Sequence, residues 1–193
     1  MKTNQWATPI VDHFSIRVWP SDSTSIIFSQ SLRSGEIRIV DYYEASGEGF
    51  PHYVRILNEK GYTYGKHWPP HDIAVRELGT GKSRKETAAQ LGLKFQSPPA
   101  KLELVDGIDA TRLVLAKCWF NEATTGPLLE ALRNYRKSLN TRLQEFTGTP
   151  VHNWASHGAD AMRGLAVRHR TPVEKRPTPP APRVPTGPMA WGA

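Results

Sequence analysis

The chain is poor in cysteine and lacks long apolar runs. Its single cysteine, Cys118, excludes an intramolecular disulfide framework and a zinc site built from several thiolates. No run of about eighteen apolar residues could span a bilayer, and the first residues lack the apolar stretch of a signal peptide. We therefore expect a cytoplasmic protein with no membrane partner. Cys118 lies in the apolar run LVLAKCWF, which predicts a buried core position.

Positive charge is concentrated near the C-terminus. The 193 residues carry a net charge of +7, and residues 168–193 account for +4 of it, with five Lys or Arg against Glu174. The same segment holds seven of the sixteen prolines, a composition that favours a disordered tail over a packed core. A basic chain is compatible with a polyanion such as DNA, although a solvated surface explains the charge equally well.

The remaining length suits one compact α/β domain. Hydrophobic periodicity, turn residues and caps predict strands first and then mostly helices, which indicates a mixed sheet flanked by helices. Within the third strand, Ile37, Ile39 and Asp41 are expected to share a face. Strands are expected at 12–19, 23–30, 36–45, 63–68 and 94–97, and helices at 49–61, 84–91, 105–117, 125–137 and 154–168.

Two separated acidic motifs indicate a metal site. Asp72 follows the strand at 63–68, where α/β sheets present side chains to ligands, and Asp160 is placed mid-helix among small residues, with His157 on the same face. Carboxylate oxygens are suitable ligands for Mg²⁺ or Mn²⁺, and two such ions bound side by side can catalyse cleavage of a phosphodiester bond. The alternatives stay open: Asp72 as a turn-capping residue, and Asp160 as a helical partner of Arg163.

A third acidic candidate lies at the end of the strand at 36–45. Asp41 and Glu44 are three residues apart and so point to opposite faces of a regular strand, and Glu44 is favoured because it borders the Gly47–Gly49 turn. A solvated strand-end glutamate is the alternative.

A basic segment adjoins Asp72. The run GTGKS resembles a phosphate-binding loop, but that motif requires glycine at position 76, where the chain has Arg76. We expect Arg76, Lys82, Arg84 and Lys85 instead to form a basic loop and helix start for DNA backbone phosphates, with a merely solvated charged loop as the alternative.

Several motifs in order resemble the nuclease domain of tailed-phage terminase large subunits: GEIRIVDYYEASGEG, YGKHWPPHDIAVRELGTGKSR, LEALRNYR and HNWASHGADAMRGLA. The resemblance covers residues 13–168 and implies a ribonuclease H-like fold, with 1–12 as an N-terminal extension and 169–193 as the tail. It implies an endonuclease that cuts concatemeric viral DNA during genome packaging in the bacterial host cell, with Asp72 and Asp160 as ligands of Mg²⁺ or Mn²⁺ and Glu44 as a further catalytic residue. The implied partners are double-stranded DNA and a portal, a small terminase subunit or a separate ATPase motor.

The chain departs from the family pattern on its first strand. When the chain is aligned with the family pattern at Asp22-Ser23-Thr24, Arg17 takes the position at which the family has an aspartate. A guanidinium group cannot ligate a cation. We therefore expect weakened metal binding and impaired cleavage. The 193 residues also contain no Walker A motif or ATPase domain. Alternatives are an inactive DNA-binding or assembly module, a prophage remnant that retains the fold, or another ribonuclease H-like enzyme such as a resolvase or transposase.

Overall fold

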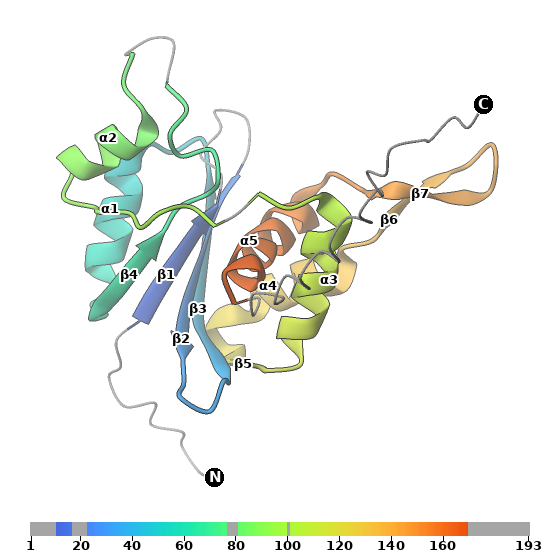
Figure 1. Ribbon diagram of the computed structural model, residues 1–193, viewed down its shortest axis with the longest axis horizontal. Coiled ribbons are helices and arrows are strands. Elements are labelled where there is room, and N and C mark those ends of the chain that lie inside the picture. The colour runs from blue at the N-terminus through green and yellow to red at the C-terminus, as the bar shows by residue number, and fades with distance from the viewer. Residues whose placement is uncertain (1–10, 17–22, 77–80, 100, 170–193) are drawn as a thin grey trace, which may run out of the picture.

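A central mixed sheet organises the chain (Figure 1). The computed structural model describes residues 11–16, 23–76, 81–99 and 101–169, and the side chains of 12–16 are not covered. Arg17 and the proline-rich segment 170–193 lie outside the described residues. The sheet has the order β4-β1-β2-β3-β5, and its strands are β1 (Val11–Ile16), β2 (Ser23–Ser31), β3 (Ile37–Ser46), β4 (Tyr64–Trp68) and β5 (Cys118–Phe120).

The strands run in two directions. β2 is antiparallel to β1 and β3, whereas β4 pairs in parallel with β1 and β5 in parallel with β3. Only β2 therefore opposes the other strands of this sheet, and the C-terminal ends of β1, β3 and β4 meet at one edge. This is the edge at which α/β sheets bind ligands.

The hairpin β2–β3 forms as its sequence predicts. β2 is rich in β-branched residues and is buried over Ser23–Gln30. The turn places Gly35 at φ +87°, a conformation that suits glycine, and Gly35 N donates to Leu32 O over 3.0 Å.

A β-bulge changes the faces of β3. The pairing moves from Ser29↔Ile39 to Phe28↔Asp41, so Val40 is the extra residue. Ile39 packs in the core cluster that contains α5, whereas Asp41 accepts a hydrogen bond from Lys60 on the opposite side of the sheet. The expectation that Ile37, Ile39 and Asp41 share a face is therefore wrong, because the bulge reverses the alternation beyond Ile39.

Helices cover both faces of the sheet (Figure 1). The apolar residues of α1 and α2 pack with Val11, Ile26 and Phe28, and those of α3, α4 and α5 pack with Ile27 and Ile39. Burying one such large side chain contributes about 1.5–3 kcal/mol. The helices are α1 (Phe50–Glu59), α2 (Arg84–Gln90), α3 (Leu104–Leu115), α4 (Glu122–Asn134) and α5 (Trp154–His169).

The local signals that end and begin helices are confirmed. Gly61 follows α1 at φ +65°, which suits a residue just past a helix C-terminus. Ser83 caps α2: its hydroxyl accepts from Glu86 N over 3.2 Å, and Glu86 Oε2 accepts from Ser83 N over 2.7 Å.

The second half of the chain differs from expectation in three places. Residues 94–97 form no full strand, and Phe95 makes a single parallel bridge to His67. Residues 118–120 form β5, in a stretch where the sequence predicts no helix or strand, and Cys118 is half-buried there. Helix α4 ends at Asn134, and the chain continues into an unexpected hairpin of β6 (Lys137–Asn140) and β7 (Glu145–Pro150).

Among the described residues, no helix combines the length and the apolar character that crossing a bilayer requires.

Candidate functional site

The candidate site lies where the C-terminal ends of β1, β3 and β4 approach the start of α5 (Figure 1). Strand register connects the parts: Ile16 pairs with Ser25, and Ser25 pairs with Glu44. Glu44 on β3 therefore lies in the same row of the sheet as the last described residue of β1. Arg17, one residue further on, is outside the described residues.

Asp72 is held in a tight turn after β4. Ile73, 1% exposed, anchors this turn in the core, and Val75 N donates to Asp72 O over 3.0 Å. One carboxylate oxygen, Oδ2, is 3.6 Å from Arg84 Nη1. The other, Oδ1, is buried and accepts no hydrogen bond from the described residues. Because a buried oxygen without a donor is costly, this atom marks a place where a water or a cation would be stabilised.

The basic segment beside Asp72 divides into two parts. Arg76, Lys82 and Lys85 are exposed, as expected of side chains that bind phosphates. Arg84, the first residue of α2, is 6% exposed and directs its guanidinium to Asp72. Arg84 is thus buried against the carboxylate and differs from its three neighbours, with which the sequence grouped it.

Glu44 connects β3 to α5. Its Oε1 is 2.9 Å from His157 Nδ1, and its Oε2 accepts the hydroxyl of Tyr42. Tyr42 Oη in turn lies 3.0 Å from Ser25 Oγ. Burial, and then the hydrogen bond to Glu44, raise the pKa of Tyr42 above its ordinary value, so its hydroxyl stays protonated and donates.

His157 is the side chain that the sequence did not assign to the site. It lies in the first turn of α5, and its contact with Glu44 fixes the orientation of the ring. The available signal was its position three residues before Asp160. What sequence spacing could not show was that Glu44, 113 residues away, is its partner.

Asp160 lies one turn further along α5 and has another partner. Its Oδ1 is 3.0 Å from Arg163 Nη1, and its side chain is 15% exposed. Burial, and then the charge of Asp160, raise the pKa of Tyr135, the residue that caps the end of α4. Asp160 therefore sits on the flank of α5 near α4, in the ion pair that was the alternative interpretation of its motif.

The described residues test how well a divalent cation would fit. No group of three or more His, Cys, Asp or Glu side chains among them is placed to hold a metal ion. The oxygen that fits a cation is Asp72 Oδ1, since it is buried and accepts no hydrogen bond from these residues. Glu44 has hydrogen-bond partners, and Asp160 is paired with Arg163.

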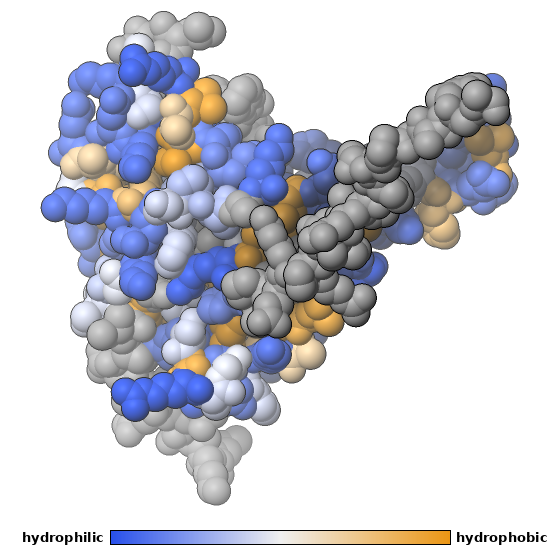
Figure 2. Space-filling model, viewed as in Figure 1, coloured by the Kyte–Doolittle hydropathy of each residue, from blue (hydrophilic) through white to orange (hydrophobic). Residues whose placement is uncertain are grey.

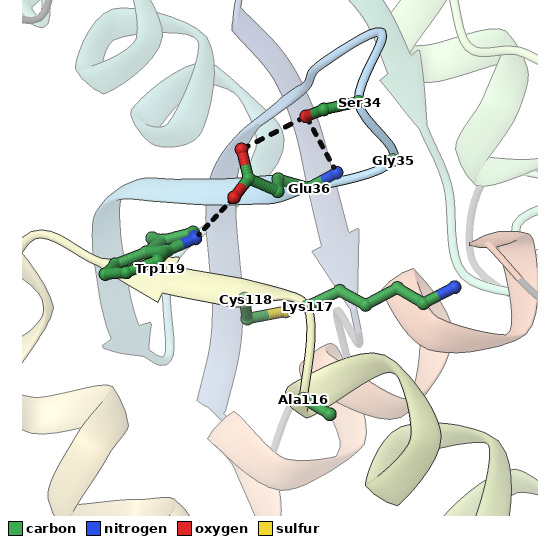
Figure 3. Close-up of a pocket in the computed structure, with 7 residues that line it drawn as sticks. All are labelled: Ser34, Gly35, Glu36, Ala116, Lys117, Cys118 and Trp119. Carbon is green, nitrogen blue, oxygen red and sulfur yellow. Dashed lines mark hydrogen bonds between the residues drawn. The ribbon is translucent and has the colours of Figure 1, made fainter.

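A hollow lies elsewhere in the molecule, away from Asp72 and Glu44 (Figure 3). It has a volume of about 490 Å³ and lies beside the β2–β3 turn, at the opposite end of β3 from Glu44. Its one carboxylate, Glu36, already accepts from Ser34 Oγ over 3.0 Å and from Trp119 Nε1 over 3.3 Å. The carboxylate end of the sheet is therefore the better candidate for chemistry.

The strand order and the helices on both faces define a ribonuclease H-like α/β fold. Within that class, the fold is that of large terminase nuclease domains. The nuclease domain of the large terminase of bacteriophage SPP1, with bound Mn, superposes with a TM-score of 0.59 at 11% identity, over 84% of this chain and 88% of the other. The P22 large terminase nuclease domain gives 0.60 at 17% identity, over 82% and 80%.

A third similar structure is the large terminase nuclease of the thermophilic phage G20c with bound magnesium. Its TM-score is 0.50 at 17% identity, over 82% of this chain and 80% of the other. No protein-family model and no curated protein matches the chain. The structures confirm the expected fold, and at these identities they establish the fold alone.

Proposed function

We propose that the chain is a terminase-type endonuclease domain that cuts concatemeric viral double-stranded DNA during genome packaging. The observation that carries the proposal is Asp72 Oδ1, a buried carboxylate oxygen without a hydrogen-bond donor among the described residues, at the ligand-binding edge of a large-terminase nuclease fold. A portal, a small terminase subunit or a separate ATPase motor are the partners this function requires.

Each candidate residue has a distinct role in this proposal. Asp72 and Asp160 would hold Mg²⁺ or Mn²⁺, and such ions supply Lewis-acid stabilisation of the phosphodiester oxygens and a lowered pKa of the attacking water. Glu44 orients His157 through its hydrogen bond to Nδ1. For Asp160 to act as a ligand, it must exchange its contact with Arg163. Arg76, Lys82 and Lys85 bind phosphates from the exposed face, and Arg84 positions Asp72.

The test is nicking of supercoiled plasmid by the full chain with Mg²⁺ or Mn²⁺, alongside calorimetric titration of Mn²⁺. Asp72→Asn keeps the shape of the side chain and removes its charge. We expect it to lower the nicking rate by at least about 100-fold, because metal stabilisation is worth several kcal/mol. The matched control is Asp109→Asn, an exposed carboxylate on α3. Nicking that persists in Asp72→Asn would show that this assignment is wrong.

A second candidate function is a DNA-binding or assembly module that does not cleave, such as a prophage remnant. The observation that favours it is that both proposed metal ligands already contact arginines, Asp72 with Arg84 and Asp160 with Arg163. Arg17, which lies outside the described residues, adds a third cation through the sequence alignment with the family. DNA binding that is unaffected by chelator, without nicking in any divalent metal, supports this candidate. Nicking that appears only in Arg17→Asp would show that the lost carboxylate had disabled the site.

A further inference from the structure

The hairpin β6–β7 projects from the body of the molecule, away from the central sheet (Figure 1). Its two strands pair with each other, with Leu139 opposite Phe146 and Asn140 opposite Glu145. Three large apolar side chains are nonetheless exposed: Leu139 at 45%, Leu143 at 57% and Phe146 at 70%. Orange apolar atoms appear among blue ones on this projection in Figure 2. A surface of this kind indicates an interaction site.

The tip of the hairpin is preorganised. Asn140 Oδ1 accepts hydrogen bonds from Arg142 N over 3.1 Å and from Leu143 N over 3.2 Å. Gln144 adopts φ +54°, and its Nε2 donates to Thr141 O over 2.8 Å. A tip held by its own side chains loses less conformational freedom on binding than a floppy loop would.

The charge of the hairpin selects the partner. Arg136, Lys137 and Arg142 are exposed, and none of them contacts a carboxylate among the described residues. The one carboxylate between positions 136 and 150 is Glu145, so this segment carries a net charge of +2. Cations that contact no carboxylate within the described part of the chain, interleaved with apolar side chains, suit a polyanion whose interior is apolar, such as duplex DNA.

The base of the hairpin lies near the candidate site. Val151 N donates to Arg136 O over 2.9 Å and closes the base, and α5 begins three residues later at Trp154. His157, in the first turn of α5, makes the contact with Glu44. In Figure 1 the hairpin and α2 lie on opposite sides of this edge of the sheet. A duplex at the site would therefore extend toward the hairpin on one side and the basic segment of α2 on the other.

We propose that the hairpin β6–β7 is a second DNA-binding element, which binds the duplex beside the candidate cleavage site. Arg136, Lys137 and Arg142 contact backbone phosphates, while Leu143 and Phe146 pack on sugars or base edges. The major groove of B-DNA is about 12 Å wide and admits a two-stranded ribbon. The proposal rests on the proposed function, since it takes DNA as the substrate, but it concerns binding and not cleavage.

The test measures binding of the full chain to a fluorescent duplex in chelator, by anisotropy over a range of salt concentrations. Lys137→Gln/Arg142→Gln removes two hairpin cations. The matched control, Arg33→Gln/Lys117→Gln, removes one exposed arginine and one exposed lysine at the other end of the sheet. We expect the hairpin pair to reduce the slope of log K against log salt by about 1.8, at roughly 0.9 per phosphate contact, and to lower the affinity at 100 mM salt by roughly 10- to 100-fold. The control pair should change neither.

A further variant separates DNA from a protein partner. Phe146→Ala should weaken DNA binding severalfold with an unchanged salt slope, because it removes an apolar contact and no charge. Equal slopes for the hairpin pair and the control pair would overturn the proposal. So would a Phe146→Ala variant that binds DNA normally but loses self-association in sedimentation experiments.

The hairpin proposal and the proposed function fail in different ways. If the hairpin variants bind DNA as the parent does while plasmid nicking persists, the hairpin proposal is wrong and the nuclease stands. If the parent binds DNA through the hairpin but never nicks in any metal, the nuclease proposal is wrong and the hairpin proposal stands.

Discussion

Gly158 is a point of close packing between α5 and its neighbours on α4 and β3, and Gly158→Ala tests that packing. In an exposed helix interior, the change from glycine to alanine stabilises by about 1 kcal/mol. Here the added methyl would lie 3.0 Å from Ala131 Cβ, 3.1 Å from Leu128 Cδ1 and 3.2 Å from Tyr42 Oη. Carbon atoms prefer separations of about 3.5–4.0 Å, so the new methyl meets three atoms too closely.

The neighbours of Gly158 have little room to yield. Leu128 is fully buried and Ala131 is 2% exposed, both on α4, and Tyr42 is held by its hydrogen bond to Glu44. Overpacking of such a core costs about 1–3 kcal/mol. Set against the gain in helix propensity, the expected net effect of Gly158→Ala is a loss of up to about 2 kcal/mol. For a chain of this size, each kcal/mol lowers Tm by about 2–4 °C.

Urea denaturation followed by circular dichroism measures this change. Ala131→Gly alone should also destabilise, by about 1 kcal/mol, because it places glycine inside α4. In the double variant Gly158→Ala/Ala131→Gly the closest contact is relieved, so the loss should be smaller than the sum by more than the usual additivity error of about 0.5 kcal/mol. A single variant Gly158→Ala that is about 1 kcal/mol more stable than the parent, as propensity alone predicts, would refute the close packing of α5 on α4.

Four further outcomes are expected. Ser83→Ala should lower the free energy of unfolding by about 1 kcal/mol in urea through loss of the N-cap, and an unchanged midpoint would contradict the cap. Hydrogen bonds from Ser83 lower the pKa of the Glu86 carboxyl group. The ionised carboxylate therefore stabilises the fold at pH values above its unfolded pKa, and this contribution is lost as the pH falls through the folded pKa. NMR titration of Glu86 should show a pKa below 4.5, and this pKa should rise in Ser83→Ala. Burial raises the pKa of Cys118 to about 12, so Ellman's reagent at pH 8 should label the native thiol far more slowly than the unfolded one, and equal rates would refute its burial. Lys60→Met leaves Asp41, 3% exposed, without its cation and should cost about 3 kcal/mol in thermal or urea unfolding, whereas a loss below about 1 kcal/mol would show that the pair is not essential.

Local features of the fold could be predicted from the sequence because their causes are local. The β2–β3 hairpin follows from β-branched runs around a glycine turn, and the start of α2 follows from Ser83 and Glu86 three residues apart. The opposite orientations of Asp41 and Glu44 are also confirmed: Asp41 faces Lys60, and Glu44 faces His157. Two residues separated by an odd number of positions point to opposite faces of a strand, provided that no bulge lies between them, so the spacing of Asp41 and Glu44 is enough to predict their orientations.

Features with distant causes were missed. The bulge at Val40 is visible only in the register between β2 and β3, and it moved Asp41 to the face of α1. The short strand β5 has too few residues to carry a periodicity, and it forms because Ile37 and Ile39 provide an edge to pair with. The hairpin β6–β7 has exposed apolar residues in place of a buried face, so alternation could not reveal it.

The candidate site shows the same division. The sequence by itself determined which carboxylates are candidates, Glu44 on β3, Asp72 after β4 and Asp160 on α5, and, through motifs in order, the kind of fold that holds them. Only the tertiary structure decided their partners, since it brought His157 to Glu44 and buried Arg84 beside Asp72. The physical reason is that motif spacing follows local backbone geometry, whereas the partner of a charged group depends on which side chains the packed sheet and helices place within a few ångströms of it.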